Sequence, residues 1–266
     1  MQKVKPQPYI GITGLTSMSE IRAIFEINKN LNLSLESNHL PMLGFLVSDK
    51  TLRGSSTENY RYPSVRDIPY LVEKASKEAF SMIHYNTHDK TTIFEQVKEL
   101  FDKIYPLGCR AIQFNVIWPP AEQISLIKDS FPEMKIVFQA SKKVMTEHQN
   151  EIVEKLNKYV NNLDYFLIDP SSGIGKEFNL EESLNFYNLI TNNFSHLTIG
   201  FAGGLNSTNV YSETNKILNL IKSSDFCIDA EGGLRNKVTE IYGQDFLDIN
   251  QAKGYLSNAL KAFNKL

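Results

Sequence analysis

Residues 165–178 read YFLIDPSSGIGKEF. The apolar run 166–168 ends in a single carboxylate, Asp169, and a small-residue loop with Gly173 and Gly175 follows it. A buried strand that ends in an acid and opens into a glycine loop is typical of α/β enzymes, which carry their chemistry at the carboxyl ends of parallel strands. We therefore expect 165–169 to be one strand of a parallel sheet.

Two later stretches repeat this pattern: residues 198–206 read TIGFAGGLN, and residues 226–234 read FCIDAEGGL. Backbone N–H groups at the start of a helix bind phosphate well, and residues without a Cβ let the phosphate approach them closely. One glycine pair alone would indicate only a tight turn, but two pairs in successive loops favour a phosphate site. The predicted phosphate-binding residues are Gly173, Gly175, Gly203, Gly204, Gly232 and Gly233.

Apolar runs alternate with amphipathic stretches along the whole chain, with short connections. The expected strands are 9–13, 42–47, 80–85, 111–116, 135–139, 165–169, 198–201 and 226–229. The expected helices follow them, near 19–27, 68–80, 91–104, 121–130, 147–161, 180–191, 207–222 and 250–265. Strict alternation predicts a parallel sheet with right-handed crossovers. Eight units in about 250 residues favour a closed (β/α)8 barrel, in the α/β class, over an open doubly wound sheet.

The sequence shows no linker or low-complexity segment, so we expect one barrel domain over residues 1–266. The one long loop, 48–62, is polar and rich in serine, and loops of this length are often functional. The net charge of −2 gives no reason to expect nucleic acid or a membrane surface as a partner. Two cysteines without metal-ligand spacing, no signal-peptide segment and no long apolar run predict a cytoplasmic protein.

Several polar side chains stand where strands end. Asp169 has the position of a general acid or base, although an aspartate there can also cap the loop. Asp229 allows the same two interpretations; anchoring of the loop is favoured for it, and it is also a candidate substrate-binding residue. Gln113 is expected to face a polar substrate, and Arg61 in the long loop is a candidate clamp for a substrate carboxylate. His84 and His88 have no matching third ligand, so we predict no metal site and no cofactor.

These stretches resemble phosphoribosylanthranilate isomerase over nearly the whole chain. Residues 11–16, GITGLT, are similar to the first-strand K-I-C-G-L-T of that family, and 201–206, FAGGLN, are similar to its L-A-G-G-L-N. Residues 167–178 resemble its L-L-D…G-x-G-K-x-F segment, and 229–234, DAEGGL, stand where it has D-V-S-S-G-V. Residues 61–62 resemble the end of its S-P-R-Y, and 111–114 resemble its V-V-Q-L.

The resemblance implies a (β/α)8 barrel and an Amadori rearrangement of an aminoaldose phosphate to an aminoketose phosphate. It implies that Asp169 is the general acid, that the glycine loops hold the phosphate and that Arg61 holds the anthranilate carboxylate. The catalytic base of the family is the cysteine of K-I-C-G, and Thr13 stands at that position. A hydroxyl is a poor base near neutral pH without an activating neighbour. Glu231 puts a negative charge beside the proposed phosphate, and Arg235 is placed to compensate it.

Three hypotheses follow. The first is an isomerase that acts on a small phosphorylated sugar. The second keeps the barrel and the phosphate site but uses Asp169, with Glu231 or His84, in a different reaction such as an aldolase or an epimerase. The third is a non-catalytic paralogue that binds a phosphorylated metabolite, and the absence of the thiol at Thr13 motivates it.

Overall fold

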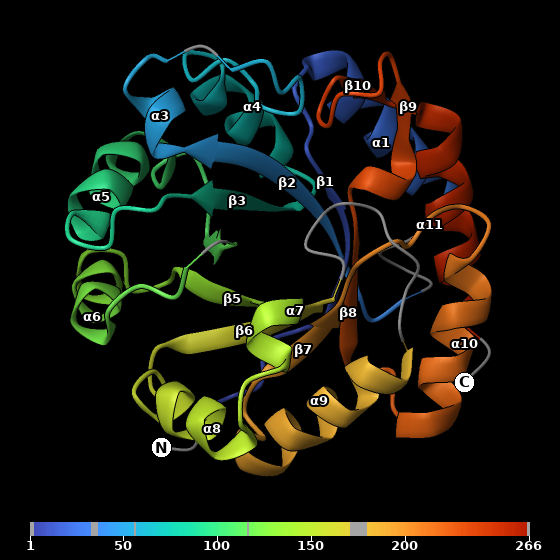
Figure 1. Ribbon diagram of the computed structural model, residues 1–266. Coiled ribbons are helices and arrows are strands. Elements are labelled where there is room, and N and C mark those ends of the chain that lie inside the picture. The colour runs from blue at the N-terminus through green and yellow to red at the C-terminus, as the bar shows by residue number, and fades with distance from the viewer. Residues whose placement is uncertain (1–2, 33–36, 56, 116, 171–179, 265–266) are drawn as a thin grey trace.

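A computed structural model describes residues 3–32, 37–55, 57–115, 117–170 and 180–264 of the chain. Eight parallel strands pair in chain order and close between the first and the last, so the predicted (β/α)8 barrel is confirmed (Figure 1). The barrel strands are β1 (Tyr9–Thr13), β2 (Leu40–Ser48), β3 (Phe80–Asn86), β4 (Ala111–Phe114), β5 (Lys135–Ser141), β6 (Leu163–Asp169), β7 (Thr198–Phe201) and β8 (Phe226–Ala230).

Helices surround the strands on all sides (Figure 1). They are α1 (Met18–Leu31), α3 (Asp49–Leu52), α4 (Ile68–Ala75), α5 (Ile93–Ile104), α6 (Ala121–Ser130), α7 (Lys142–Met145), α8 (Gln149–Asn157), α9 (Leu180–Asn193), α10 (Val210–Ile221) and α11 (Ile249–Phe263). The first begins where the sequence predicts, because Ser17 and Glu20 form a reciprocal capping box. None of the helices in the described part of the chain has the length and apolar character needed to cross a membrane.

The structure differs from the expected elements in three places. The long loop begins with the short helix α3, which Ser48 and Thr51 cap with reciprocal hydrogen bonds. The helix expected over 147–161 is the shorter α8, and an additional short helix, α7, precedes it across the turn at 146–148. After β8, a 3-10 turn (Gly232–Leu234) leads into an antiparallel hairpin, β9 (Arg235–Lys237) and β10 (Asp245–Leu247), which the sequence pattern did not predict.

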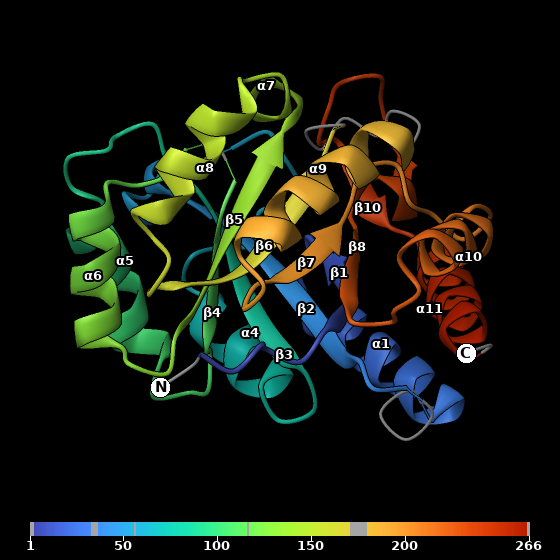
Figure 2. The ribbon, with the colours of Figure 1, turned by 90° about the horizontal axis from the view of Figure 1, so that it is seen from below.

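Inside the barrel, side chains alternate along each strand, as the pleat requires. In β6, Tyr165 and Leu167 pack into the apolar interior of the barrel, while Phe166 and Ile168 belong to the larger core between strands and helices. The next inward position after Leu167 is Asp169, which lines a cavity at the carboxyl ends of the strands. The side view shows this end of the barrel, where the arrowhead of β5 lies toward α7 (Figure 2). The strand period therefore places an apolar floor below a polar mouth.

The outer core depends on large side chains such as Phe226, which is fully buried between the rings of Phe201 and Phe263, with centroid distances of 5.5 and 5.2 Å. We expect Phe226→Ala to lower the free energy of unfolding by about 3–5 kcal/mol, because it leaves a cavity that the rigid barrel cannot close. Urea unfolding measures this change. Leu220→Ala is the control, since that side chain is 60% exposed and its loss should cost no more than about 0.5 kcal/mol. Similar losses for the two variants would contradict the packing argument.

Candidate functional site

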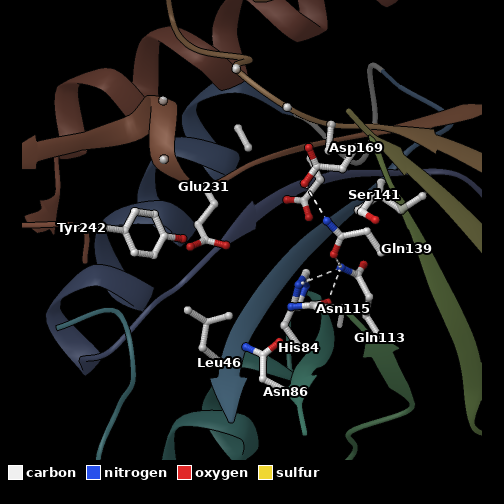
Figure 3. Close-up of a pocket in the computed structure, with 18 of the residues that line it drawn as sticks. Leu46, His84, Asn86, Gln113, Asn115, Gln139, Ser141, Asp169, Glu231 and Tyr242 are labelled. Atoms are coloured by element: carbon white, nitrogen blue, oxygen red, sulfur yellow. Dashed lines mark hydrogen bonds between the residues drawn. The ribbon is translucent and has the colours of Figure 1, made fainter. Parts of the chain in front are cut away.

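A cavity of about 550 Å³ lies at the carboxyl ends of the barrel strands. Its lining includes three carboxylates, Asp169, Asp229 and Glu231, and no lysine or arginine among the described residues. Figure 3 shows Glu231 and Tyr242 on one side of the cavity, and Asp169 with the amides of β4 and β5 on the other. The site is therefore polar and rich in acids, and its acids lie on the strands and loops that the sequence singled out.

Asp169 ends β6 and is 5% exposed. One of its carboxylate oxygens accepts a hydrogen bond of 2.6 Å from the amide nitrogen of Gln139, which lies on the neighbouring strand β5 (Figure 3). Asp169 pairs with Ser141 on β5, and Gln139 lies two residues before Ser141, one inward position deeper in the barrel. The carboxylate is thus held against the barrel wall at the edge of the cavity.

Asp229 in β8 reaches the same cavity and is also 5% exposed. Burial raises the pKa of its carboxyl to about 8, the hydrogen bond from Thr13 acts in the opposite direction, and the negative charges of Glu231 and Asp169 add to the increase. Asp229 therefore keeps its proton at neutral pH. The position combines a strand end, a polar cavity and a shifted pKa, which together mark a candidate acid or base.

Thr13 hydrogen-bonds to Asp229 and does not line the cavity. Its hydroxyl is buried and donates to the two carboxyl oxygens of Asp229, at 3.0 and 3.1 Å. The amide nitrogen of Gln113 can only donate, so Nδ1 of His84 accepts and Nε2 carries the ring proton, which it donates to the Thr13 hydroxyl at 3.2 Å. Burial lowers the pKa of His84 to about 3, so the ring is neutral and Nδ1 accepts from the amide of Gln113, at 3.2 Å.

Thr13 and His84 lie on β1 and β3, with β2 between them, and a glycine makes their contact possible. A Cβ added to Gly44 would lie 2.5 Å from the Thr13 hydroxyl and 2.8 Å from Nε2 of His84. The hydrogen bond between Thr13 and His84 therefore occupies the space that a side chain at Gly44 would fill. The row of contacts continues from Gln113 to Gln139, at 3.5 Å, and from there to Asp169. It connects the surroundings of the two acids along the barrel wall.

Arg61 is brought to a different place from the predicted one. Its guanidinium is buried and donates to Asp245 on β10, at 2.6 and 2.9 Å, and to Glu231, at 2.7 Å. It does not line the cavity. Burial opposes its charge, but the bonds to Asp245 and Glu231 outweigh burial and raise its pKa. The clamp predicted for a substrate carboxylate thus holds two carboxylates of the chain itself.

The charge of Glu231 is compensated by a direct ion pair with Arg61, and the nearby charge of Arg235 adds to this, as the sequence predicted. Arg235 donates to the backbone carbonyls of Thr13 and Gly14 and lies 3.7 Å from Asp245. The long loop and the hairpin β9–β10 are further joined at Tyr60, whose amide donates to the carbonyl of Gly243. These contacts attach the long loop to the rim of the cavity.

The glycines of loops seven and eight lie together. Gly203 and Gly204 have φ angles of +98° and +77°, which only glycine adopts without strain, and both line the cavity. Gly232 and Gly233 begin the 3-10 turn and also line it, and the side chain of Glu231 does not cap that turn. A Cβ on Gly233 would lie 2.2 Å from the carbonyl oxygen of Leu205, so the two loops pack against each other. Gly173 and Gly175 lie outside the described residues.

The structure thus brings Asp169, Asp229, Gln113 and four of the six glycines to one cavity. Sequence reasoning did not identify Gln139, Tyr242 or Asp245. Gln139 had a signal, since it is a polar residue at an inward position of an apolar strand. Asp245 had none, because its role depends on a hairpin that no short pattern indicated. Among the described residues, no group of three or more His, Cys, Asp or Glu side chains is arranged to hold a metal ion.

No protein-family profile matches the chain, and no curated protein sequence matches it. Solved structures are similar in fold. Phosphoribosyl anthranilate isomerase from Thermococcus kodakaraensis superposes with a TM-score of 0.58 at 15% identity, over 94% of this chain and 98% of that one. Tryptophan synthase subunit alpha from Legionella pneumophila gives 0.61 at 14%, over 99% and 94%. QR15, an aldolase, gives 0.51 at 12%, over 85% and 90%. At these identities the likeness establishes the barrel fold.

The raised pKa of Asp229 makes stability depend on pH. The carboxyl titrates at about 3.9 in the unfolded chain, and at about 8 in the folded one. Between these values the folded state binds one more proton than the unfolded state, so this group lowers stability as pH rises, by about 1.4 kcal/mol per pH unit at most. Asn cannot titrate. We therefore expect urea unfolding from pH 5 to pH 8 to show wild type losing stability relative to Asp229→Asn; parallel curves would contradict the shift.

Proposed function

We propose that this chain is an enzyme that interconverts the aldose and ketose forms of a small phosphorylated sugar or sugar amine by acid–base catalysis. One observation carries the proposal: two buried carboxyl groups, Asp169 and Asp229, reach one cavity from β6 and β8 in unlike surroundings. Such an isomerisation needs an acid for ring opening and a base for the proton at C2. Pairs of titratable groups with unlike environments are suited to these two roles.

The surroundings assign the roles. Asp229 holds its proton at neutral pH, because its pKa is raised to about 8, and so it is the general acid. Asp169 accepts a short hydrogen bond from the amide of Gln139. Such a bond stabilises the ionised form of a carboxyl, so Asp169 is the base that removes the C2 proton. The resemblance to phosphoribosylanthranilate isomerase implies the opposite role for Asp169. The proposed assignment also explains Thr13: its hydroxyl orients the acid and is not itself the base.

The phosphate of the substrate would bind to loops seven and eight. The positive φ angles of Gly203 and Gly204 and the uncapped start of the 3-10 turn support this location, because backbone amides without side chains in front can approach an anion. Glu231 lies nearby, and its pairing with Arg61 reduces the repulsion. Barrels frequently bind phosphate at these two loops.

The comparisons support the proposal at the level of fold. The similar structures named above include an isomerase and an aldolase. We infer from the motifs and the site that the chain is a divergent relative of the isomerase. Isomerisation only moves protons, so the proposed reaction needs no redox cofactor. An aldolase or epimerase is the second candidate, because Glu231 adds a third carboxylate to the cavity.

Replacing either acid should abolish most of the activity. We expect Asp169→Asn and Asp229→Asn each to lower kcat by about 10²–10⁴-fold on 5-phosphoribosylanthranilate or on an aldose phosphate that wild type converts, since each removes one proton-transfer group. Asp225→Asn is the matched control, because Asp225 is an exposed residue just before the other end of β8. Unchanged turnover in Asp169→Asn would remove the mechanism. Binding of sugar phosphates without turnover of any of them would favour the non-catalytic alternative.

The role of Thr13 predicts a shift in the pH–rate profile. Thr13→Val removes the hydrogen bond that favours the charged form of Asp229, so the pKa of Asp229 should rise and the alkaline limb of the profile should move to higher pH. Thr13→Ser keeps the hydroxyl and should leave the limb where it is. If Thr13 were itself the base, valine would instead abolish activity at every pH.

A further inference from the structure

A second cavity of about 380 Å³ lies beside the first, between the ends of β4 and β5 and the helices α7 and α8. The two cavities share three lining residues, Asn115, Gln139 and Ser141. Gln139 is also the residue that donates to Asp169. The two cavities therefore adjoin at these residues, and the second cavity lies next to a ligand whose reacting carbon is at Asp169.

The charge of the second cavity is opposite to that of the first. Among the described residues, four lysines line it, Lys90, Lys143, Lys155 and Lys158, with a single acid, Glu147. Lys155 pairs with Glu147. Within the described part of the chain, the other three lysines form no ion pair. They come from three segments, the loop before α5, helix α7 and the end of α8. Three cations of separate origin thus meet at one cavity.

The wall behind the lysines contains two aromatic side chains that are hydrogen-bonded to the backbone. The indole nitrogen of Trp118 donates to the carbonyl of Gln139 at 3.0 Å, and its ring stacks on Phe138. The hydroxyl of Tyr159 donates to the carbonyl of Pro119 at 2.6 Å. Because both polar groups of these aromatic residues are bound to the backbone, they offer a ligand mainly apolar surface. The lysines are the groups that can bind a charged ligand there.

We propose that the second cavity is an anion-binding subsite that takes a phosphate ester at the end of the substrate remote from the glycine loops. The proposal rests on the proposed function for what lies in the first cavity. The carboxylate of Asp169 repels an anion from its side of the first cavity, whereas the lysines of the second cavity attract one, so the electrostatic field directs an acidic group past Gln139. The substrate class is then a phosphorylated sugar amine that carries a second phosphate on the substituent of its nitrogen, because a phosphate ester at C1 itself would prevent ring opening.

Isothermal titration of the full chain with ribose 5-phosphate and with ribulose 1,5-bisphosphate tests the subsite. Wild type should bind the bisphosphate about tenfold more tightly or better, since the second phosphate gains charged hydrogen bonds. The triple variant Lys90→Gln, Lys143→Gln, Lys158→Gln should lose this preference and keep its affinity for the monophosphate. The preference of wild type should also shrink as KCl is raised, because these lysines are exposed.

The matched control is Lys77→Gln, Lys103→Gln, Lys261→Gln, which removes the same charge from exposed lysines at or just after the ends of α4, α5 and α11. It should retain the preference. No preference in wild type, an unchanged preference in the first triple variant, or equal loss in the control would overturn the subsite. Loss of affinity for both probes in the first variant would keep the lysine site but move the phosphate away from the glycine loops. Full turnover by Asp169→Asn beside an intact bisphosphate preference would remove only the proposed reaction.

Discussion

The two-residue period of the strands, imposed on a closed barrel, is the constraint on which this structure depends. Each strand must send every second side chain inward, so the same positions that fill the floor with Tyr165 and Leu167 bring Asp169 to the mouth. On β1 the inward series ends in Thr13, which holds Asp229. A shift of one residue in either strand would bury these polar groups against the helices. Packing of the core and placement of the acids are consequences of one geometry.

A second constraint is the management of negative charge. In the described part of the chain, three carboxylates line the main cavity, and each has a separate partner: Asp169 has Gln139, Asp229 has Thr13, and Glu231 has Arg61. Burial without a positive partner raises the pKa of a carboxyl, and it raises that of Asp229 to about 8. Glu231 forms an ion pair because the long loop places Arg61 next to it. The loop is therefore part of the electrostatic structure of the site, whatever contact it makes with a ligand.

Sequence reasoning was most successful where the information was local. Apolar runs and amphipathic spacing predicted the barrel, and the helix expected near 19–27 is found as α1. It was least successful where a residue depends on a distant partner. Arg61 was assigned to a substrate, but it binds Asp245, which is 184 positions away on an unpredicted hairpin. Thr13 was interpreted as a poor replacement for a catalytic base. Nothing in the neighbouring sequence indicates that its hydroxyl donates a hydrogen bond to Asp229.

By itself, the sequence determined the alternation of strands and helices, the glycine loops at the strand ends and the presence of acids there, because these features are written in short stretches of chain. Only the tertiary structure decided which polar groups meet. The Thr13–His84 contact forms because Gly44 on the strand between them has no side chain, and the lysines of the second cavity converge because three separate segments end at one place. The physical reason is that hydrogen bonds and buried charges depend on distances in space, which closure of the barrel sets and local sequence does not.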